Sequence, residues 1–183
     1  MLPIVIKPEM LNALVIGDGD ATDRRLQMLK DAGVKNIHYI KEIPSETDLE
    51  GINIAYVADF DDETSKIIAD KIRSKGILLN TEDKLTMCDF HVPAIVRRGD
   101  LLATVSTNGQ SPRMARRFRQ ILEYIFPKEW SENLSHIGKE RQGWKSQGLG
   151  FQEVGEKTDE MVEQKEMMKK FCDNCIEASK VKK

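Results

Sequence analysis

The sequence predicts an α/β fold whose N-terminal part is a Rossmann-like parallel sheet. Short apolar segments alternate with segments of helical period as far as Pro127, and Gly33 and Gly76 close the first two helical segments. Two further glycines, Gly17 and Gly19, directly follow the first apolar segment. Such alternation is typical of parallel strands joined by right-handed helical crossovers. After Pro127 the residues are mostly charged, and we expect a helical C-terminal tail.

Four strands and two helices are expected before residue 80. The strands are short apolar runs of the kind found in buried parallel sheets, at residues 13–16, 36–40, 53–58 and 77–79. The helices carry apolar residues on one face and end near a glycine, over residues 22–32 and 62–74. Ligands of open parallel sheets bind at the carboxyl ends of the strands. The segments expected to face one crevice are therefore residues 17–21, 40–42, 58–60 and 80–83.

Length and composition narrow the class of protein. The chain has 183 residues, of which 40% are hydrophobic, enough for a buried core. Its formal net charge of −2 gives no general attraction to nucleic acid or to an anionic membrane. No apolar run approaches the roughly 18 residues that a membrane span needs. Three cysteines without the spacing of a disulfide framework fit a reduced, cytoplasmic protein.

The turn after the first strand is the candidate dinucleotide loop. Gly17 permits a tight turn, and Gly19 lets the backbone approach a pyrophosphate at the N-terminus of the next helix. Thr22 replaces the third glycine of the usual pattern, so we expect slightly looser packing of helix on strand. Asp18 and Asp20 would repel phosphate unless they point away. An ordinary glycine-containing turn is the alternative interpretation.

The segment after the second strand is expected to contact the adenosine half of the cofactor. Glu42 could accept hydrogen bonds from ribose hydroxyls, and Lys41 could meet a phosphate, although both could also belong to a solvated loop. These residues leave the choice between NAD and NADP open. The predicted cofactor-binding residues are Gly17, Asp18, Gly19, Asp20, Ala21, Lys41, Glu42, Ala58, Asp59 and Asn80.

A second block of polar residues follows the fourth strand. Asp83 can reach the nicotinamide end of the crevice and could take a proton when hydride leaves the neighbouring carbon, or it could simply cap a loop. Phe90 and Val92 are expected to point to the core while His91 points to the site, where it could bind a carboxylate or shuttle a proton. A structural histidine is the alternative.

A hairpin and an arginine-rich helix come next. Strands are expected at residues 94–96 and 101–106, followed by a helix that Ser111 caps and that runs through Ile125. The apolar residues along one face of this helix are typical of a buried core or a dimer interface. The polar loop before the helix is a possible anion cradle, because it lies at a helix N-terminus beside arginines. A merely solvated charged face is the alternative.

These motifs together resemble the precorrin-2 dehydrogenases of siroheme synthesis, which include the N-terminal module of siroheme synthase. The resemblance covers about residues 1–127 and is carried by the glycine loop, by Asn80-x-x-Asp83 and by residues 105–112. It implies oxidation of precorrin-2 to sirohydrochlorin with Asp83 as the catalytic residue. It also implies an NAD-binding domain at residues 1–93, a homodimerisation segment at 94–127 and a helical domain at 128–183.

The resemblance also suggests how the substrate is held. Precorrin-2 carries acetate and propionate groups, which suit arginines and a helix N-terminus. The predicted substrate-binding residues are His91, Thr107, Asn108, Ser111, Arg113 and Arg116. No resident metal is expected, and Cys172-x-x-Cys175 lacks further ligands nearby.

One departure from the family leaves other activities open. The connection over residues 41–52 is shorter than in the family, with room for one helical turn capped by Ser45. A sirohydrochlorin ferrochelatase, alone or combined with the dehydrogenase, and a non-catalytic tetrapyrrole or nucleotide-binding protein are therefore alternatives. In the tail, apolar spacing predicts a helix over residues 156–171, with Trp130 and Trp144 as anchors.

Overall fold

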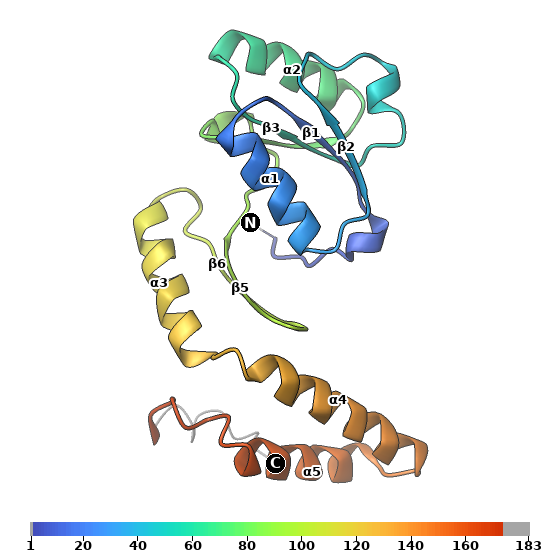
Figure 1. Ribbon diagram of the computed structural model, residues 1–183, viewed down its shortest axis with the longest axis vertical. Helices are drawn as coiled ribbons and strands as arrows, with labels where there is room; N and C mark the ends of the chain where they lie inside the picture. Colours follow the sequence, from blue (N-terminus) through green and yellow to red (C-terminus); the bar gives the residue numbers. More distant parts are fainter. Residues whose placement is uncertain (1, 174–183) are drawn as a thin grey trace. The chain divides into compact units, whose positions relative to one another are not determined.

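The structure, a computed structural model, describes residues 2–173 of the chain (Figure 1). The chain divides into two compact units between Val92 and Pro93. Unit 1 precedes this boundary and unit 2 follows it. The sequence-based boundary between a dimerisation segment and a helical domain at residue 127 stays a prediction.

Unit 1 is built on a parallel sheet of the predicted kind. Its strands have the order β2-β1-β3-β4. Ile16 pairs with Ile40 on one side and with Val57 on the other, so neighbouring strands end at the same edge. The strands are β1 (Asn12–Ile16), β2 (Asn36–Ile40), β3 (Ile54–Val57) and β4 (Leu78–Thr81). The α/β prediction is confirmed.

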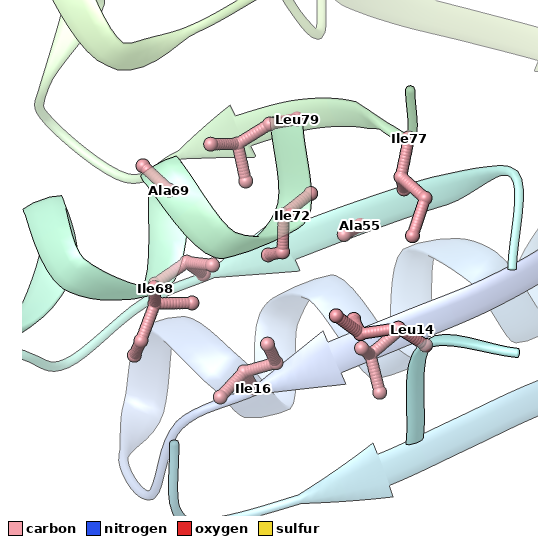
Figure 2. Close-up of a cluster of buried hydrophobic side chains, with 10 residues drawn as sticks. Leu14, Ile16, Ala55, Ile68, Ala69, Ile72, Ile77 and Leu79 are labelled. Carbon is pink, nitrogen blue, oxygen red and sulfur yellow. The ribbon is translucent and has the colours of Figure 1, made fainter. Parts of the chain in front are cut away.

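Two helices cover opposite faces of this sheet, α1 (Asp20–Asp31) and α2 (Asp62–Ser74) (Figure 1). Ile68 and Ile72 lie one turn apart on α2, are fully buried and pack against Leu79 and its neighbours (Figure 2). Leu29 of α1 packs on the other face. Burying a branched aliphatic side chain contributes about 1.5–3 kcal/mol, so these two layers carry most of the stability of unit 1.

The structure corrects two boundaries in unit 1. Helix α1 begins at Asp20, two residues before the predicted start, because Gly19 already occupies the N-cap position. Strand β4 continues through Thr81, so Asn80 lies within the strand and is buried. The prediction placed it just beyond the strand, since its polar side chain looked like the start of a loop.

Unit 1 also contains three short 3-10 helices, one before β1 and two in later loops. They are η1 (Pro8–Met10), η2 (Thr47–Leu49) and η3 (Leu85–Met87). The second is the turn predicted in the shortened 41–52 connection. There the Ser45 hydroxyl accepts a 3.3 Å hydrogen bond from the backbone N–H of Asp48.

Unit 2 begins with an antiparallel hairpin and continues as helices. The hairpin and the helix α3, which packs against it, follow the prediction. The ring of Trp130 contacts Phe126 and Phe171, and Lys157 lies over Trp144, so both tryptophans anchor this unit as expected. The elements are β5 (Ala94–Arg98), β6 (Leu101–Val105), α3 (Pro112–Ile125), α4 (Trp130–Ser146) and α5 (Phe151–Gln164).

The predicted helix over residues 156–171 is wrong in its second half. Helix α5 ends at Gln164, and Glu166 has a positive φ of 48°, which an α-helix does not allow. The backbone N–H of Met167 then bonds to the carbonyl of Val162. The chain turns here and still buries Met167, and this is why apolar spacing alone suggested a continuing helix. The partner of Cys172 in the C-x-x-C pair, Cys175, lies outside the described residues.

No helix within residues 2–173 combines the length and the apolar character that crossing a bilayer requires.

Candidate active site

Four loops leave the carboxyl edge of the sheet in unit 1, as predicted. Backbone hydrogen bonds extend the strand pairing into these loops: Gly17 N–H to Ile40 O (3.1 Å), Ala58 N–H to Ile16 O (3.0 Å) and Glu82 N–H to Val57 O (2.9 Å). The glycine loop and the loop that carries Asp83 therefore start from neighbouring positions on one edge, where ligands of such sheets bind.

The glycine loop packs tightly against its surroundings. Gly17 has a φ of 149°, and a Cβ atom there would lie 2.2 Å from the Thr22 hydroxyl and 2.3 Å from the Ala58 carbonyl oxygen. Thr22 is fully buried. The looser packing expected from Thr22 at the third glycine position is therefore wrong, since its hydroxyl fills the space beside Gly17.

The N-terminus of α1 is capped from another loop. Asp59 follows β3, and its Oδ2 accepts hydrogen bonds from the backbone N–H (2.9 Å) and the hydroxyl (2.7 Å) of Thr22. The side-chain bond from Thr22 is the main reason why the pKa of Asp59 lies below its usual value. A Cβ at Gly19 would come within 2.8 Å of the Asp59 Cγ, so glycine is needed there to admit this carboxylate.

Lys41 and Asp18 form an exposed ion pair beside the glycine loop. Their Nζ and Oδ1 atoms lie 2.8 Å apart, and this hydrogen bond raises the pKa of Lys41. Asp18 thus points to a cation. Asp20 and Ala21 form the first turn of α1, Glu42 is exposed and Ala58 is buried. Among the predicted cofactor-binding residues in this region, Lys41 and Asp18 form an ion pair.

Asn80 supports the loop that follows β4. Its Nδ2 donates a 2.9 Å hydrogen bond to the carbonyl of Phe90 and lies 3.5 Å from the Cys88 sulfur. The Oδ1 of Asn80 is buried and has no hydrogen-bond partner among the residues that the structure describes. Cys88 accepts a bond from the Thr81 N–H, and burial raises the pKa of its thiol, as expected for a structural cysteine.

Asp83 is exposed in a loop that is held on both sides. Its φ is 57°, a left-handed conformation that non-glycine residues seldom adopt. On one side Glu82 pairs with Arg25 of α1 and lies 3.5 Å from Arg24. On the other side Lys84 donates to the Phe60 carbonyl (2.8 Å). These contacts fix the backbone while leaving the Asp83 carboxylate open to solvent.

The arginines of α1 are residues that sequence reasoning missed. Arg24 and Arg25 looked like an ordinary charged helix face, yet they tie α1 to the loop that carries Asp83. The signal available in the sequence was weak, because a pair of basic residues in an amphipathic helix is common. Asp59 was predicted to bind cofactor, but its contact with Thr22 was not foreseen.

His91 lies between two core residues, as expected. Phe90 packs edge-on against Tyr56 at 5.5 Å, and both Phe90 and Val92 pack against the cluster beneath α1. His91 itself is half-buried. The alternation predicted from the sequence is confirmed for the two apolar residues, and the role of the histidine stays a prediction.

The remaining predicted site residues lie in unit 2. Ser111 caps α3 by accepting a 3.3 Å bond from the Met114 N–H, and Thr107 accepts a 3.1 Å bond from the Ser111 N–H. Asn108 has a φ of 53°. These bonds confirm the predicted cap by Ser111, and the role of the loop as an anion cradle stays a prediction. Arg113 and Arg116 are exposed on the first turns of α3.

Two neighbouring arginines have structural partners instead. Arg98 donates to the carbonyls of Phe126 (2.7 Å) and Glu123 (3.4 Å) and so caps the C-terminus of α3. Arg119 pairs with Glu123. Neither adds a free charge to an anion site. A hollow of 340 Å³ in unit 2, lined by Trp130 and Asn133 among others, contains none of the predicted site residues.

Two known protein families match different parts of this chain. The family described as "Putative NAD(P)-binding" matches residues 4–94, and the one described as "Sirohaem biosynthesis protein central" matches residues 98–124. The first range carries the glycine loop and Asp83. The second carries β6 and most of α3.

Curated relatives and a solved structure agree with these matches. The siroheme synthase of Methylococcus capsulatus is 32% identical over 145 residues, which are 69% of this chain and 31% of the relative. That of Salmonella heidelberg is 28% identical over 175 residues, 85% of this chain and 38% of the relative. The chain thus spans about a third of the length of these relatives.

The solved structure of SirC, precorrin-2 dehydrogenase, superposes with a TM-score of 0.71 and 18% identity, covering 92% of this chain and 98% of that one. It therefore shares the fold. The two family matches, the siroheme synthase relatives and this common fold lead to one conclusion: the chain belongs to the siroheme synthase family.

Proposed function

We propose that this protein oxidises precorrin-2 to sirohydrochlorin with NAD as the hydride acceptor and Asp83 as the proton acceptor. The observation that carries the proposal is the placement of Asp83. It lies in a left-handed conformation on a loop held by Glu82 and Lys84, at the same sheet edge as the glycine loop. Backbone held in such a sparsely populated conformation is frequent at functional sites.

The residues of unit 1 fit a dinucleotide. Gly17 and Gly19 let the loop turn closely against its neighbours and lead into the N-terminus of α1, where a pyrophosphate binds in folds of this kind. A bound nicotinamide supplies the hydride acceptor. Lys41 and Glu42 lie after β2, on the side of the adenosine ribose. NAD is the cofactor that we propose, and NADP is the comparison to run beside it.

The proposed chemistry balances without a further oxidant. In this oxidation the macrocycle loses a hydride and a proton. The nicotinamide would take the hydride, and the Asp83 carboxylate would take the proton. Asp83 is exposed, so it can pass that proton on to water. A positioned carboxylate base contributes about 10²–10⁴-fold to such a step.

Unit 2 is proposed to bind the carboxylates of the substrate. Arg113 and Arg116 are exposed at the start of α3, where the helix dipole also favours anions. Thr107, Asn108 and Ser111 form the ordered turn before that helix. Guanidinium groups bind carboxylates in bidentate fashion, which suits a macrocycle with acidic side chains on its rim.

The test is anaerobic turnover of precorrin-2 by the wild-type protein and by Asp83→Asn, with NAD or NADP. We expect cofactor-dependent sirohydrochlorin formation in the wild type, reduced about 10²–10⁴-fold in Asp83→Asn. Asp31→Asn is the matched control, because Asp31 ends α1 and bonds only locally to Gln27. Absence of conversion by the wild type with either nucleotide would overturn the proposal.

A ferrochelatase is the second candidate, favoured by the small adenosine side of unit 1. The 41–52 connection adds only the 3-10 helix η2, and β2 is therefore an edge strand of a four-stranded sheet. In that case Asp83 would accept pyrrole protons while iron, as a substrate, enters sirohydrochlorin. Iron insertion without any nucleotide-dependent oxidation would favour this candidate.

A further inference from the structure

We infer that the Asp59 carboxylate competes with the cofactor diphosphate for the N-terminus of α1, and so sets the affinity for the dinucleotide. The inference rests on the proposed function, because it concerns the same glycine loop. It makes Asp59 an affinity-determining residue that leaves the helix terminus when a dinucleotide binds.

The first support is the pair of donors that Asp59 uses. The N–H of Thr22 lies in the first turn of α1, among the backbone groups that face a bound pyrophosphate in dinucleotide-binding folds. In this protein that N–H donates to Asp59 Oδ2 at 2.9 Å, and the Thr22 hydroxyl donates to the same oxygen at 2.7 Å. A carboxylate and a diphosphate are both anions, and they cannot occupy these donors together.

The second support comes from the neighbouring helix. Asp61 caps α2 from the ordinary N-cap position and accepts from the Thr64 N–H (2.8 Å) and hydroxyl (3.0 Å). Helix α1 has Gly19 at its N-cap, with no side-chain cap of its own. Its capping carboxylate comes instead from a loop 37 residues away in sequence. The terminus of α1 is thus left open by its own sequence and filled by Asp59.

The third support is the conformation of Asp59. Its φ of 64° is left-handed, and its carboxylate reaches the helix only because residue 19 is a glycine. Asp59 is exposed, whereas Thr22 is fully buried. Rotation of the Asp59 side chain therefore frees the donors of α1 without disturbing the core.

The surrounding charges increase the competition. Asp18, Asp20 and Asp23 lie in or beside the first turn of α1. Among nearby cations, Lys41 pairs with Asp18, and the two arginines of α1 interact with Glu82. Removing one carboxylate from this setting favours an incoming diphosphate through the helix dipole as well as through the freed hydrogen bonds.

The experiment measures binding of NAD, ADP and inorganic pyrophosphate by calorimetry to four forms of the full chain. These are the wild type, Asp59→Asn, Asp59→Gly and Asp61→Asn. Asn keeps the shape and tolerates positive φ, and Gly removes the side chain and suits the φ of 64°. Asp61→Asn is the control, since it removes the same charge from the terminus of α2.

We expect both Asp59 variants to bind all three ligands about 3- to 30-fold more tightly than the wild type, with Asp59→Gly the tighter. Asp61→Asn should bind like the wild type. Unchanged or weaker binding in both Asp59 variants, with melting temperatures near that of the wild type, would overturn the inference. Equal tightening in Asp61→Asn would also overturn it, because the effect would then be one of net charge.

The result is separable from the fate of the proposed function. Tighter pyrophosphate binding without any precorrin-2 oxidation would uphold the competition and reject the dehydrogenase. If precorrin-2 is oxidised but the Asp59 variants bind the three ligands no more tightly than the wild type, the dehydrogenase would be upheld and the competition rejected. Absence of binding by every form would reject both.

Discussion

Unit 1 and unit 2 differ in how much of their apolar surface they bury. Most buried hydrophobic residues lie in unit 1, whereas unit 2 contributes only four among the described residues, namely Val96, Ile137, Val154 and Met167. Helix α3 is strongly amphipathic but has no buried residue. Along it Met114, Ile121 and Tyr124 are each more than half exposed. Unit 1 therefore buries most of its apolar side chains within its own core. Unit 2 leaves apolar side chains of α3 exposed, and the predicted homodimer would cover them.

The largest effect is expected from the core of unit 1. Leu79→Ala removes a fully buried side chain between β4 and α2 (Figure 2) and should lower the free energy of unfolding by about 2–5 kcal/mol. Urea unfolding followed by far-UV circular dichroism measures this loss. Leu78→Ala is the matched control on the same strand, because Leu78 is 45% exposed. Equal losses in the two variants would mean that β4 is not packed as described.

A smaller effect is expected from the exposed face of α3. If this face forms the homodimer, Ile121→Ser should weaken dimerisation by at least about tenfold, since isoleucine burial contributes about 1.5–3 kcal/mol. Sedimentation velocity over a range of concentrations measures the change. Gln120→Ser serves as the control on the same helix. A wild type that is monomeric throughout, or a dimer indifferent to Ile121→Ser, would contradict the assignment of this face.

The smallest effect concerns charge at the helix ends of unit 1. Hydrogen bonds from the Thr64 backbone and hydroxyl hold the pKa of Asp61 below its usual value. A lowered pKa in the folded state stabilises the protein above the unfolded value of about 3.9, and this contribution disappears as the pH falls through the folded value. Asp61→Asn should thus lower the urea midpoint slightly at about pH 7, and its difference from the wild type should shrink as the pH falls below about 3.9. If the urea midpoints of Asp61→Asn and the wild type still differ in acid, the effect of the substitution would come from altered packing and not from the lost charge.

Elements that pack against near neighbours in the sequence could be predicted from the sequence alone. The parallel sheet and helix α2 followed from local apolar patterns, because each element buries its own face against a neighbour in sequence. The capping of α3 by Ser111 followed from a short motif as well. The end of α5 was missed because Met167 is buried from a turn, and apolar spacing does not distinguish that turn from a helix.

The sequence predicted where the residues of the candidate site lie along the sheet edge, but not which side chains contact one another. Asp83 and the glycine loop lie where the order of strands puts them, since all parallel strands end at one edge. The contact of Asp59 with Thr22 joins residues 37 positions apart, and the pairing of Arg25 with Glu82 joins residues 57 apart. No local pattern encodes such contacts. They depend on how α1 lies over the strand ends.

The most direct test of the proposed dehydrogenase activity measures both products of one reaction. Wild-type protein is incubated anaerobically with precorrin-2 and excess NAD, and sirohydrochlorin and reduced nicotinamide are quantified in the same samples. We expect the two products to accumulate in equal amounts and both to disappear almost completely in Asp83→Asn. Sirohydrochlorin formed without reduced nicotinamide, or formed equally well by Asp83→Asn, would contradict the proposed function.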